Sequence, residues 1–157
     1  MNDEPKIQIP NSVKFVLVLF LVAFVGVQAF RFYWPTVEIV VAGHKLSVQV
    51  ADNNYRQFKG LSGRKSLEPY DGMLFIFPTS KPHVFVMRGM KFPLDIIWFD
   101  KGEVVDIAPS LPPQDGVPED QLKQYLPRKA ASMVLEVKAG WALQNGLKIG
   151  DRLEVAR

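Results

Sequence analysis

The sequence predicts an all-β domain, mainly antiparallel, that forms a compact sandwich or barrel with short helices and follows one N-terminal transmembrane helix. Three observations predict it: about eight short runs of strand-forming residues, turn residues at close spacing between these runs, and one long uncharged segment near the N-terminus. At 157 residues the chain is long enough for one domain with a real core. We therefore divide it into a tail at 1–14, an apolar segment at 15–34 and a β domain at 36–157.

The apolar segment is predicted to be a membrane anchor. It contains 16 consecutive uncharged residues, Phe15–Phe30, and continues to Trp34 before Pro35 ends it. Twenty helical residues at ~1.5 Å each reach about 30 Å, the thickness of a hydrocarbon core. Arg31 and the aromatic residues after it suit the headgroup region. We therefore expect the segment Phe15–Trp34 to bind the membrane.

Two other interpretations of this segment are open. A cleaved signal peptide would use Val27 and Ala29 as the small residues at its cleavage site. A core helix would need a polar face, which the run lacks. Lys6 and Lys14 precede the segment, so the positive-inside rule favours a single-pass protein with its C-terminal domain outside the cytoplasm, in the periplasm of a bacterium.

Alternation and turn residues define the predicted elements of the domain. The strands are expected at Thr36–Val41, Lys45–Ala51, Met73–Phe77, Val84–Arg88, Leu94–Phe99, Val104–Ala108, Ser132–Val137 and Arg152–Ala156. Short helices are expected at Tyr55–Leu61, from Pro118 through Tyr125, and near Trp141–Gln144. The three strands between residues 84 and 108 should form a local antiparallel meander. The proline-rich connection at 109–128 is long enough to be a functional flap or a flexible segment.

Asp95 is the most informative residue of the predicted strands. Alternation places it on one face with Ile97 and Phe99, where an unpaired charge would be costly. It therefore lies near a sheet rim, pairs with a basic residue as a structural brace, or serves a ligand or a reaction as a carboxylate. The candidate ligand-binding residues are Arg64, Met87, Arg88, Lys91 and Asp95, and the candidate catalytic pair is Asp95 with Arg64.

Two other acidic residues lie in predicted strands. Glu136 alternates with apolar neighbours and is expected to face solvent or one of the arginines. Asp106 is expected at the surface of its strand.

Composition excludes several functional classes. Without cysteine there can be no disulfide, thiolate zinc site or cysteine nucleophile. His44 and His83 cannot supply a three-histidine metal site, and we expect no metal or cofactor. No nucleophile elbow or phosphate-binding loop is present. The net charge is only +3, so no nucleic-acid partner is expected.

Several blocks in order resemble the DUF192 family over roughly residues 38–157: GLSGRKSL, GMLFIFP, FVMRGMKFPLDIIWFD and VLEVKAG followed by GLKIGD. Arg64, Met87, Pro93 and Asp95 match the family pattern. Ser62 stands where the family usually has Met, Val86 where it has Trp, and Gly89-Met90 where it has Asn-Thr. The resemblance implies a compact β-rich fold, often behind a signal or membrane segment, and no established activity.

Three functional hypotheses follow. The first is a membrane-anchored, extracytoplasmic binding or accessory domain for an unknown small molecule or protein. The second is a small hydrolase or lyase that uses Asp95 with Arg64. The third is a scaffold subunit of a membrane assembly, which would carry an exposed apolar patch.

Overall fold

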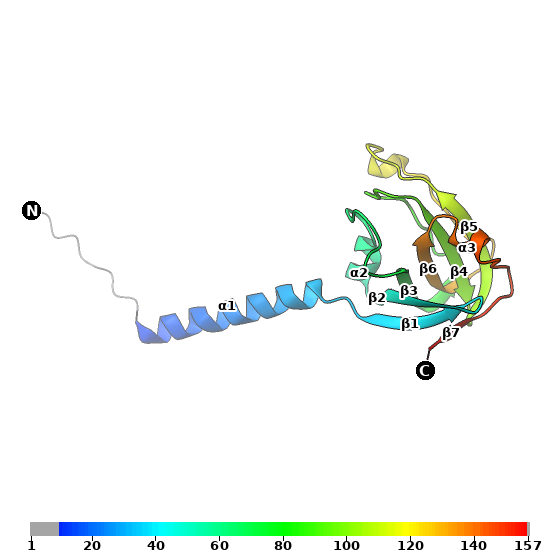
Figure 1. The fold of residues 1–157 in the computed structure, drawn as a ribbon. Helices are drawn as coiled ribbons and strands as arrows, with labels where there is room; N and C mark the ends of the chain where they lie inside the picture. Colours follow the sequence, from blue (N-terminus) through cyan, green and yellow to red (C-terminus); the bar gives the residue numbers. More distant parts are fainter. Residues whose placement is uncertain (1–9, 157) are drawn as a thin grey trace, which may run out of the picture. The chain divides into compact units, whose positions relative to one another are not determined.

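A computed structural model describes residues 10–156 (Figure 1). The chain divides into two compact units, Met1–Trp34 and Pro35–Arg157. The first contains one helix, α1 (Asn11–Phe32), and the predicted N-terminal apolar helix is therefore present. Its part from Asn11 to Ala29 has a mean hydropathy of 2.2 and is long and apolar enough to cross a membrane.

The second unit is one mixed sheet of seven strands with short helices, so the predicted fold class is confirmed. Along the sheet the strand order is β5-β4-β6-β3-β2-β1-β7. All neighbouring strands are antiparallel except β2 and β3, which are parallel. The strands are β1 (Thr36–Val41), β2 (His44–Ala51), β3 (Gly72–Lys81), β4 (Leu94–Asp100), β5 (Glu103–Leu111), β6 (Ala131–Lys138) and β7 (Leu153–Val155). The helical segments are α2 (Asn54–Lys59), the 3-10 turn η1 (Glu119–Gln121) and α3 (Trp141–Gln144).

The sheet curls into a half-barrel, as Figure 1 shows, and its two ends meet. Glu103 at the start of β5 forms a bridge with Arg152, just before β7. Next to it, the Val104 N–H donates to the Asp151 carbonyl at 2.8 Å, and the Leu153 N–H donates to the Gly102 carbonyl at 2.8 Å. These bonds pair backbone N–H and carbonyl groups that would be exposed at the edges of an open sheet.

The two faces of the sheet bury different sets of side chains. The concave interior, which we call the inner face, holds an apolar core that includes Leu74, Ile97, Phe99, Leu135 and Val137. Because side chains alternate along a strand, their neighbours point to the opposite, outer face. The buried apolar residues of β3, β4 and β6 on that face are Met73, Phe75, Ile96, Trp98 and Val134. β4 and β6 are thus buried on both faces.

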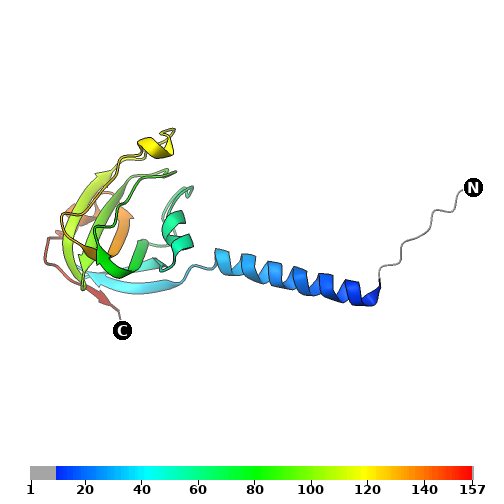
Figure 2. The same cartoon turned by 180° about the vertical axis from the view of Figure 1, so that it is seen from behind.

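The predicted meander is wrong at its first strand. Residues 84–88 are not in the sheet: Phe85 forms a single bridge with Tyr125, and the second neighbour of β4 is β6. The alternation seen in the sequence instead buries Phe85 and Met87 against the outer face. The segment from residue 84 to 92 is therefore an arm held to the proline-rich connection, and Figure 2 shows η1 at the tip of that connection.

The helix predicted from Pro118 through Tyr125 is only the single turn η1. Leu122 and Tyr125, which follow it, are both buried. A continued helix would have to give up the extended backbone by which Tyr125 bonds Phe85 at 2.8 and 2.9 Å. The tertiary contact therefore overrides the local helix signal.

Asp95 is fully buried at the start of β4, on the inner face. Its Oδ1 accepts hydrogen bonds from the Ser110 N–H at 2.7 Å and the Gly140 N–H at 2.9 Å, and its Oδ2 accepts from the Ala142 N–H at 2.8 Å. Three backbone donors thus satisfy the carboxylate. Asp95 fixes the irregular end of β5 and the first turn of α3.

We predict that Asp95→Asn lowers the free energy of unfolding by roughly 2–4 kcal/mol, because an amide NH₂ would replace an acceptor that faces a buried N–H. Guanidinium denaturation followed by tryptophan fluorescence measures the change. Asp100→Asn, at the other end of the same strand, is the matched control and should change stability by less than about 0.5 kcal/mol. Equal effects of the two substitutions would contradict the role assigned to Asp95.

Candidate functional site

A pocket of about 270 Å³ opens on the outer face beside α2. Its walls come from three segments: α2 with the loop after it, the end of β3, and the arm at 84–92. Strand β6 adds one lining residue, Glu136. The lining residues are Gln57, Phe58, Lys59, Gly60, Leu61, Ser62, Phe75, Phe77, His83, Val84, Phe85, Val86, Arg88, Met90 and Glu136.

Glu136 lies in the middle of β6 and is only 5% exposed. Its neighbours Leu135 and Val137 point into the inner core, so its own side chain points outward. Among the described residues, Glu136 Oε2 is a buried side-chain oxygen without a hydrogen-bond partner. Native structures leave few such atoms, and each requires an explanation.

Burial raises the pKa of Glu136 to about 8, and the nearby Arg64 guanidinium opposes the shift only in part. Desolvation disfavours the charged form of an acid, so at neutral pH Glu136 is mostly a neutral carboxylic acid. A neutral carboxyl group carries one O–H donor in addition to its acceptor oxygen. The pocket therefore holds a buried group that can donate a hydrogen bond.

Arg64 is bonded to β2 and places its positive charge near Glu136. Strand registers place Gln49, Met73, Glu136 and Ile96 in one row across β2, β3, β6 and β4. The Arg64 guanidinium donates to Gln49 Oε1 in this row. Burial lowers the pKa of Arg64, while Tyr70 and Glu136 oppose that shift. Gln49, Arg64 and Glu136 thus form a polar cluster on an otherwise apolar face.

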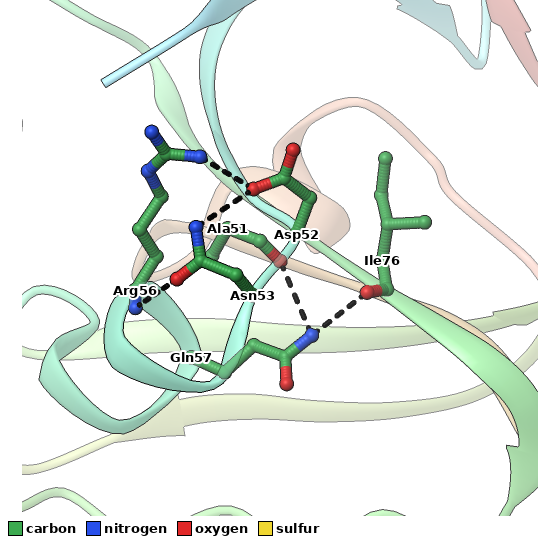
Figure 3. Close-up of polar contacts among 6 residues, drawn as sticks. All are labelled: Ala51, Asp52, Asn53, Arg56, Gln57 and Ile76. Carbon is green, nitrogen blue, oxygen red and sulfur yellow. Dashed lines mark hydrogen bonds and ion pairs between the residues drawn. The ribbon is translucent and has the colours of Figure 1, made fainter. Parts of the chain in front are cut away.

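Helix α2 is fastened to the sheet by its own polar residues (Figure 3). Asn53 Oδ1 accepts from the Arg56 N–H at 3.0 Å, which caps the helix, and Asp52 binds the Arg56 guanidinium at 2.6 Å. Gln57 Nε2 donates to the Ile76 carbonyl at 2.8 Å and reaches the Ala51 carbonyl at 3.5 Å. Gln57 thus joins β2 and β3 where their parallel pairing ends, and it sets the position of the pocket wall.

Aromatic rings line the opposite wall. Phe85 packs edge-on against Phe75, with ring centroids 4.9 Å apart, and against Trp98 at 6.2 Å. His83 stacks on Phe77 at 3.6 Å. Such contacts fix ring orientation as well as burying area. The wall is therefore apolar and well ordered by its own packing.

The arm is joined to the loop after α2 and to the proline-rich connection. Ser62 Oγ donates to the Arg88 carbonyl at 2.6 Å, and the Gly63 N–H donates to the Gly89 carbonyl at 2.9 Å. Arg88 forms a bidentate ion pair with Glu119 and lies 4.4 Å from the centroid of the Phe58 ring. The ion pair with Arg88 lowers the pKa of Glu119. The 109–128 connection therefore meets the rim of the pocket through Glu119.

The structure separates the residues that the sequence groups together. Arg64 lies on the outer face beside Glu136, and Arg88 lies on the pocket rim. Met87 is fully buried, and Lys91 pairs with Asp115 at 2.6 Å. Asp95 lies on the inner face, so the structure does not bring it together with Arg64.

Glu136 is the residue that sequence reasoning missed. The expectation that it faces solvent is wrong, because β6 is central and covered on both sides. The alternative was that Glu136 faces an arginine, and the charge of the nearby Arg64 does act to lower the pKa of Glu136. One signal could have identified it: a single acid in the strand ASMVLEVK, the same anomaly that singled out Asp95.

A second, larger pocket of about 420 Å³ lies against the loop 65–71, Pro93 and Trp141. Glu136 Oε2, the buried side-chain atom that lacks a hydrogen-bond partner among the described residues, does not line this second pocket. Within residues 10–156, no three His, Asp or Glu side chains are grouped as metal ligands. The pocket at Glu136 is therefore the stronger candidate.

Comparison with known proteins agrees with this fold. A structure of a protein of unknown function from Novosphingobium aromaticivorans is 29% identical, with a TM-score of 0.68, over 76% of this chain and 84% of that one. A structure of "a putative transcription regulator" from Sinorhizobium meliloti is 28% identical, with a TM-score of 0.65, over 78% of this chain and 94% of that one. No curated protein matches. The profile of DUF192, described as "Uncharacterized ACR", matches residues 37–155, and the chain therefore belongs to the DUF192 family.

Proposed function

We propose that this protein is a membrane-anchored binding protein whose pocket takes a small, largely apolar ligand with one hydrogen-bond acceptor. The observation that carries the proposal is Glu136 Oε2, a buried carboxyl oxygen without a partner among the described residues. A buried polar group without a hydrogen bond costs free energy, and a ligand that accepts a bond from it would recover that cost.

The size and chemistry of the pocket define the ligand class. An apolar cavity of about 150 Å³ holds benzene, and drug-sized molecules occupy roughly 300–1,000 Å³. At about 270 Å³, this pocket suits one ring with a short substituent. The rings of Phe75, Phe77 and Phe85 favour an apolar body, and Glu136 favours a carbonyl or ether oxygen at its inner end. Arg88 at the rim could contact a polar end that remains near solvent.

The membrane part of the proposal rests on α1. A helix of this length and hydropathy can span a bilayer. Lys6 and Lys14, which precede the uncharged run that begins at Phe15, favour the domain on the extracytoplasmic side.

The hydrolase or lyase alternative required Asp95 and Arg64 in one site. Asp95 lies on the face of Ile97 and Phe99, whereas Arg64 bonds Gln49 on the other face of the sheet. All three hydrogen bonds of Asp95 go to backbone N–H groups. We therefore do not propose that reaction site.

We predict that Glu136→Gln removes a pH dependence of stability. The folded protein holds the Glu136 proton up to about pH 8, whereas the unfolded chain releases it near 4.5, so the folded state binds more protons between these values. The contribution of Glu136 to the free energy of unfolding therefore falls as pH rises from about 4.5 to about 8, by an amount on the order of a few kcal/mol. Above about pH 8 this contribution no longer changes with pH. The Gln variant should be relatively more stable at pH 9 than at pH 5.5.

Denaturant unfolding of both proteins at several pH values measures this difference. Glu154→Gln, which removes an exposed carboxyl group on β7, is the matched control. Parallel stability curves for the wild type and the Glu136→Gln variant from pH 5 to 9 would show that Glu136 is not a buried neutral acid.

We predict that acetophenone binds this pocket more tightly than ethylbenzene, which has a similar shape but no acceptor. One neutral hydrogen bond is worth about 0.5–1.5 kcal/mol, or roughly two- to twelvefold in Kd. Titration of full-length protein in detergent, followed by NMR of the ligands, measures both affinities. The preference should persist in Glu136→Gln, which keeps a donor, and vanish in Glu136→Leu. Failure of both compounds to bind, or an unchanged preference in Glu136→Leu, would refute the proposed function.

A further inference from the structure

We infer that α2 and the mouth of the pocket lie against the lipid surface, so that the pocket receives its ligand from the membrane interface. This inference rests on the proposed anchoring by α1 and adds to it a partner surface and a source of ligand. Four observations within the domain support it: the exposed apolar side chains around the mouth, the place where the chain enters the domain, the length of the connection, and the residue types on α2.

Exposed apolar side chains surround the mouth of the pocket. Phe58 is 70% exposed, Tyr55 49%, Val84 47% and Ile76 39%. Phe58 and Val84 line the pocket itself, and Ile76 is tied to α2 through its carbonyl bond to Gln57. Single exposed apolar residues are ordinary, but a group around a pocket marks an interaction site.

The chain enters the domain at this same end. The Pro35 carbonyl accepts a hydrogen bond from the Val50 N–H at 2.7 Å, close to the end of β2. The next residue, Ala51, offers its carbonyl to Gln57 of α2. The entry point and the wall of the pocket are therefore attached to two adjacent residues of β2, Val50 and Ala51.

The connection between the anchor and the domain is short. α1 ends at Phe32 and β1 begins at Thr36, so only Tyr33, Trp34 and Pro35 lie between them. Three extended residues reach about 10 Å at most. If α1 spans the bilayer, the end of the domain that holds Pro35 stays within that distance of the helix end. A tether of this length favours the bilayer over a separate protein as the partner of this surface.

The residue types on α2 match the headgroup region of a membrane. Tyr55 and Phe58 are three positions apart and therefore share one side of the helix, and exposed Lys59 follows. Aromatic rings and lysine are enriched at membrane interfaces, where the ring is partly apolar and the ammonium meets lipid phosphates. Two acids beside α2 and the pocket rim are paired, Asp52 with Arg56 and Glu119 with Arg88.

The ligand class is narrowed by this placement. A pocket whose mouth faces the headgroup layer receives molecules that partition there: compounds with an apolar ring or short chain and one uncharged polar group. The same chemistry satisfies Glu136 at the inner end of the pocket. Water-soluble ions and sugars are not expected to bind.

The absence of cysteine allows a direct test with the full chain. Three single-cysteine variants, Leu21→Cys in α1, Phe58→Cys at the mouth and Leu143→Cys on α3, each carry one environment-sensitive fluorophore. Leu143 is 84% exposed and follows the far end of β6, so it is the matched control for Phe58. The proteins are reconstituted in phosphatidylcholine–phosphatidylglycerol vesicles with and without nitroxide-labelled lipid.

We expect the probes at residues 21 and 58 to lose most of their fluorescence when the nitroxide lipid is present and the probe at 143 to lose little. Quenching at 21 without quenching at 58 would overturn the inference and leave the anchor intact. No quenching at 21 would overturn the anchor and the inference together, while the acetophenone titration would still test the pocket. Equal quenching at 58 and 143 would exclude a preferred membrane face. A blue shift at 58 that the nitroxide does not quench would overturn the inference and assign the surface to contact with a second copy of this chain.

Discussion

A sheet that is covered on both faces cannot leave an ionised side chain in its central strands without a partner, and this constraint shapes the whole domain. β4 and β6 lie in the body of the sheet, and their side chains are buried on both sides. Each buries one acid, Asp95 in β4 and Glu136 in β6. Each acid has to be neutral or fully hydrogen-bonded, because the cost of an isolated buried charge exceeds the net stability of a typical domain. The two residues meet this requirement in different ways.

Their positions along the strands account for the difference. Asp95 stands near a strand end, where an irregular stretch of β5 and the first turn of α3 leave backbone N–H groups free to donate. Glu136 stands where the ladders to β3 and β4 use the neighbouring backbone donors, and Arg64 is the charged residue of the described chain that acts on it. Glu136 therefore keeps its proton, and one of its oxygens faces the pocket. Asp106 on β5 shows a third solution: burial alone would raise its pKa, but hydrogen bonds from Arg128 outweigh that effect and lower it.

The sequence predicted what depends on local pattern and failed where long-range contacts decide. Alternation correctly placed Asp95 on the face of Ile97 and Phe99, and the bounds of β1 and α3 are those expected. The expectation that a basic residue pairs with Asp95 was wrong, because backbone N–H groups bind its carboxylate. Arg88 and Lys91 instead pair with acids from the 109–128 connection, more than twenty residues away. Asp106, expected at the surface, is 6% exposed, since its partner Arg128 covers it. Residues 84–88 have a strand pattern, but their place beside β4 is taken by β6.

The positions at which this chain departs from the usual DUF192 pattern meet at the pocket wall. Gly89 has φ +58°, a conformation that Asn tolerates better than most residues, and a Cβ there would lie 3.7 Å from Ser62 Cβ. With Gly at 89 and Ser at 62, the wall is joined through backbone carbonyls instead of larger side chains. Substitution at this junction can change the shape of the pocket without touching Glu136 or the row that supports it. Ser62 and Gly89 lie on the loop after α2 and on the arm, whereas Glu136 lies on β6, so different elements set the outline of the pocket and the position of its buried acid.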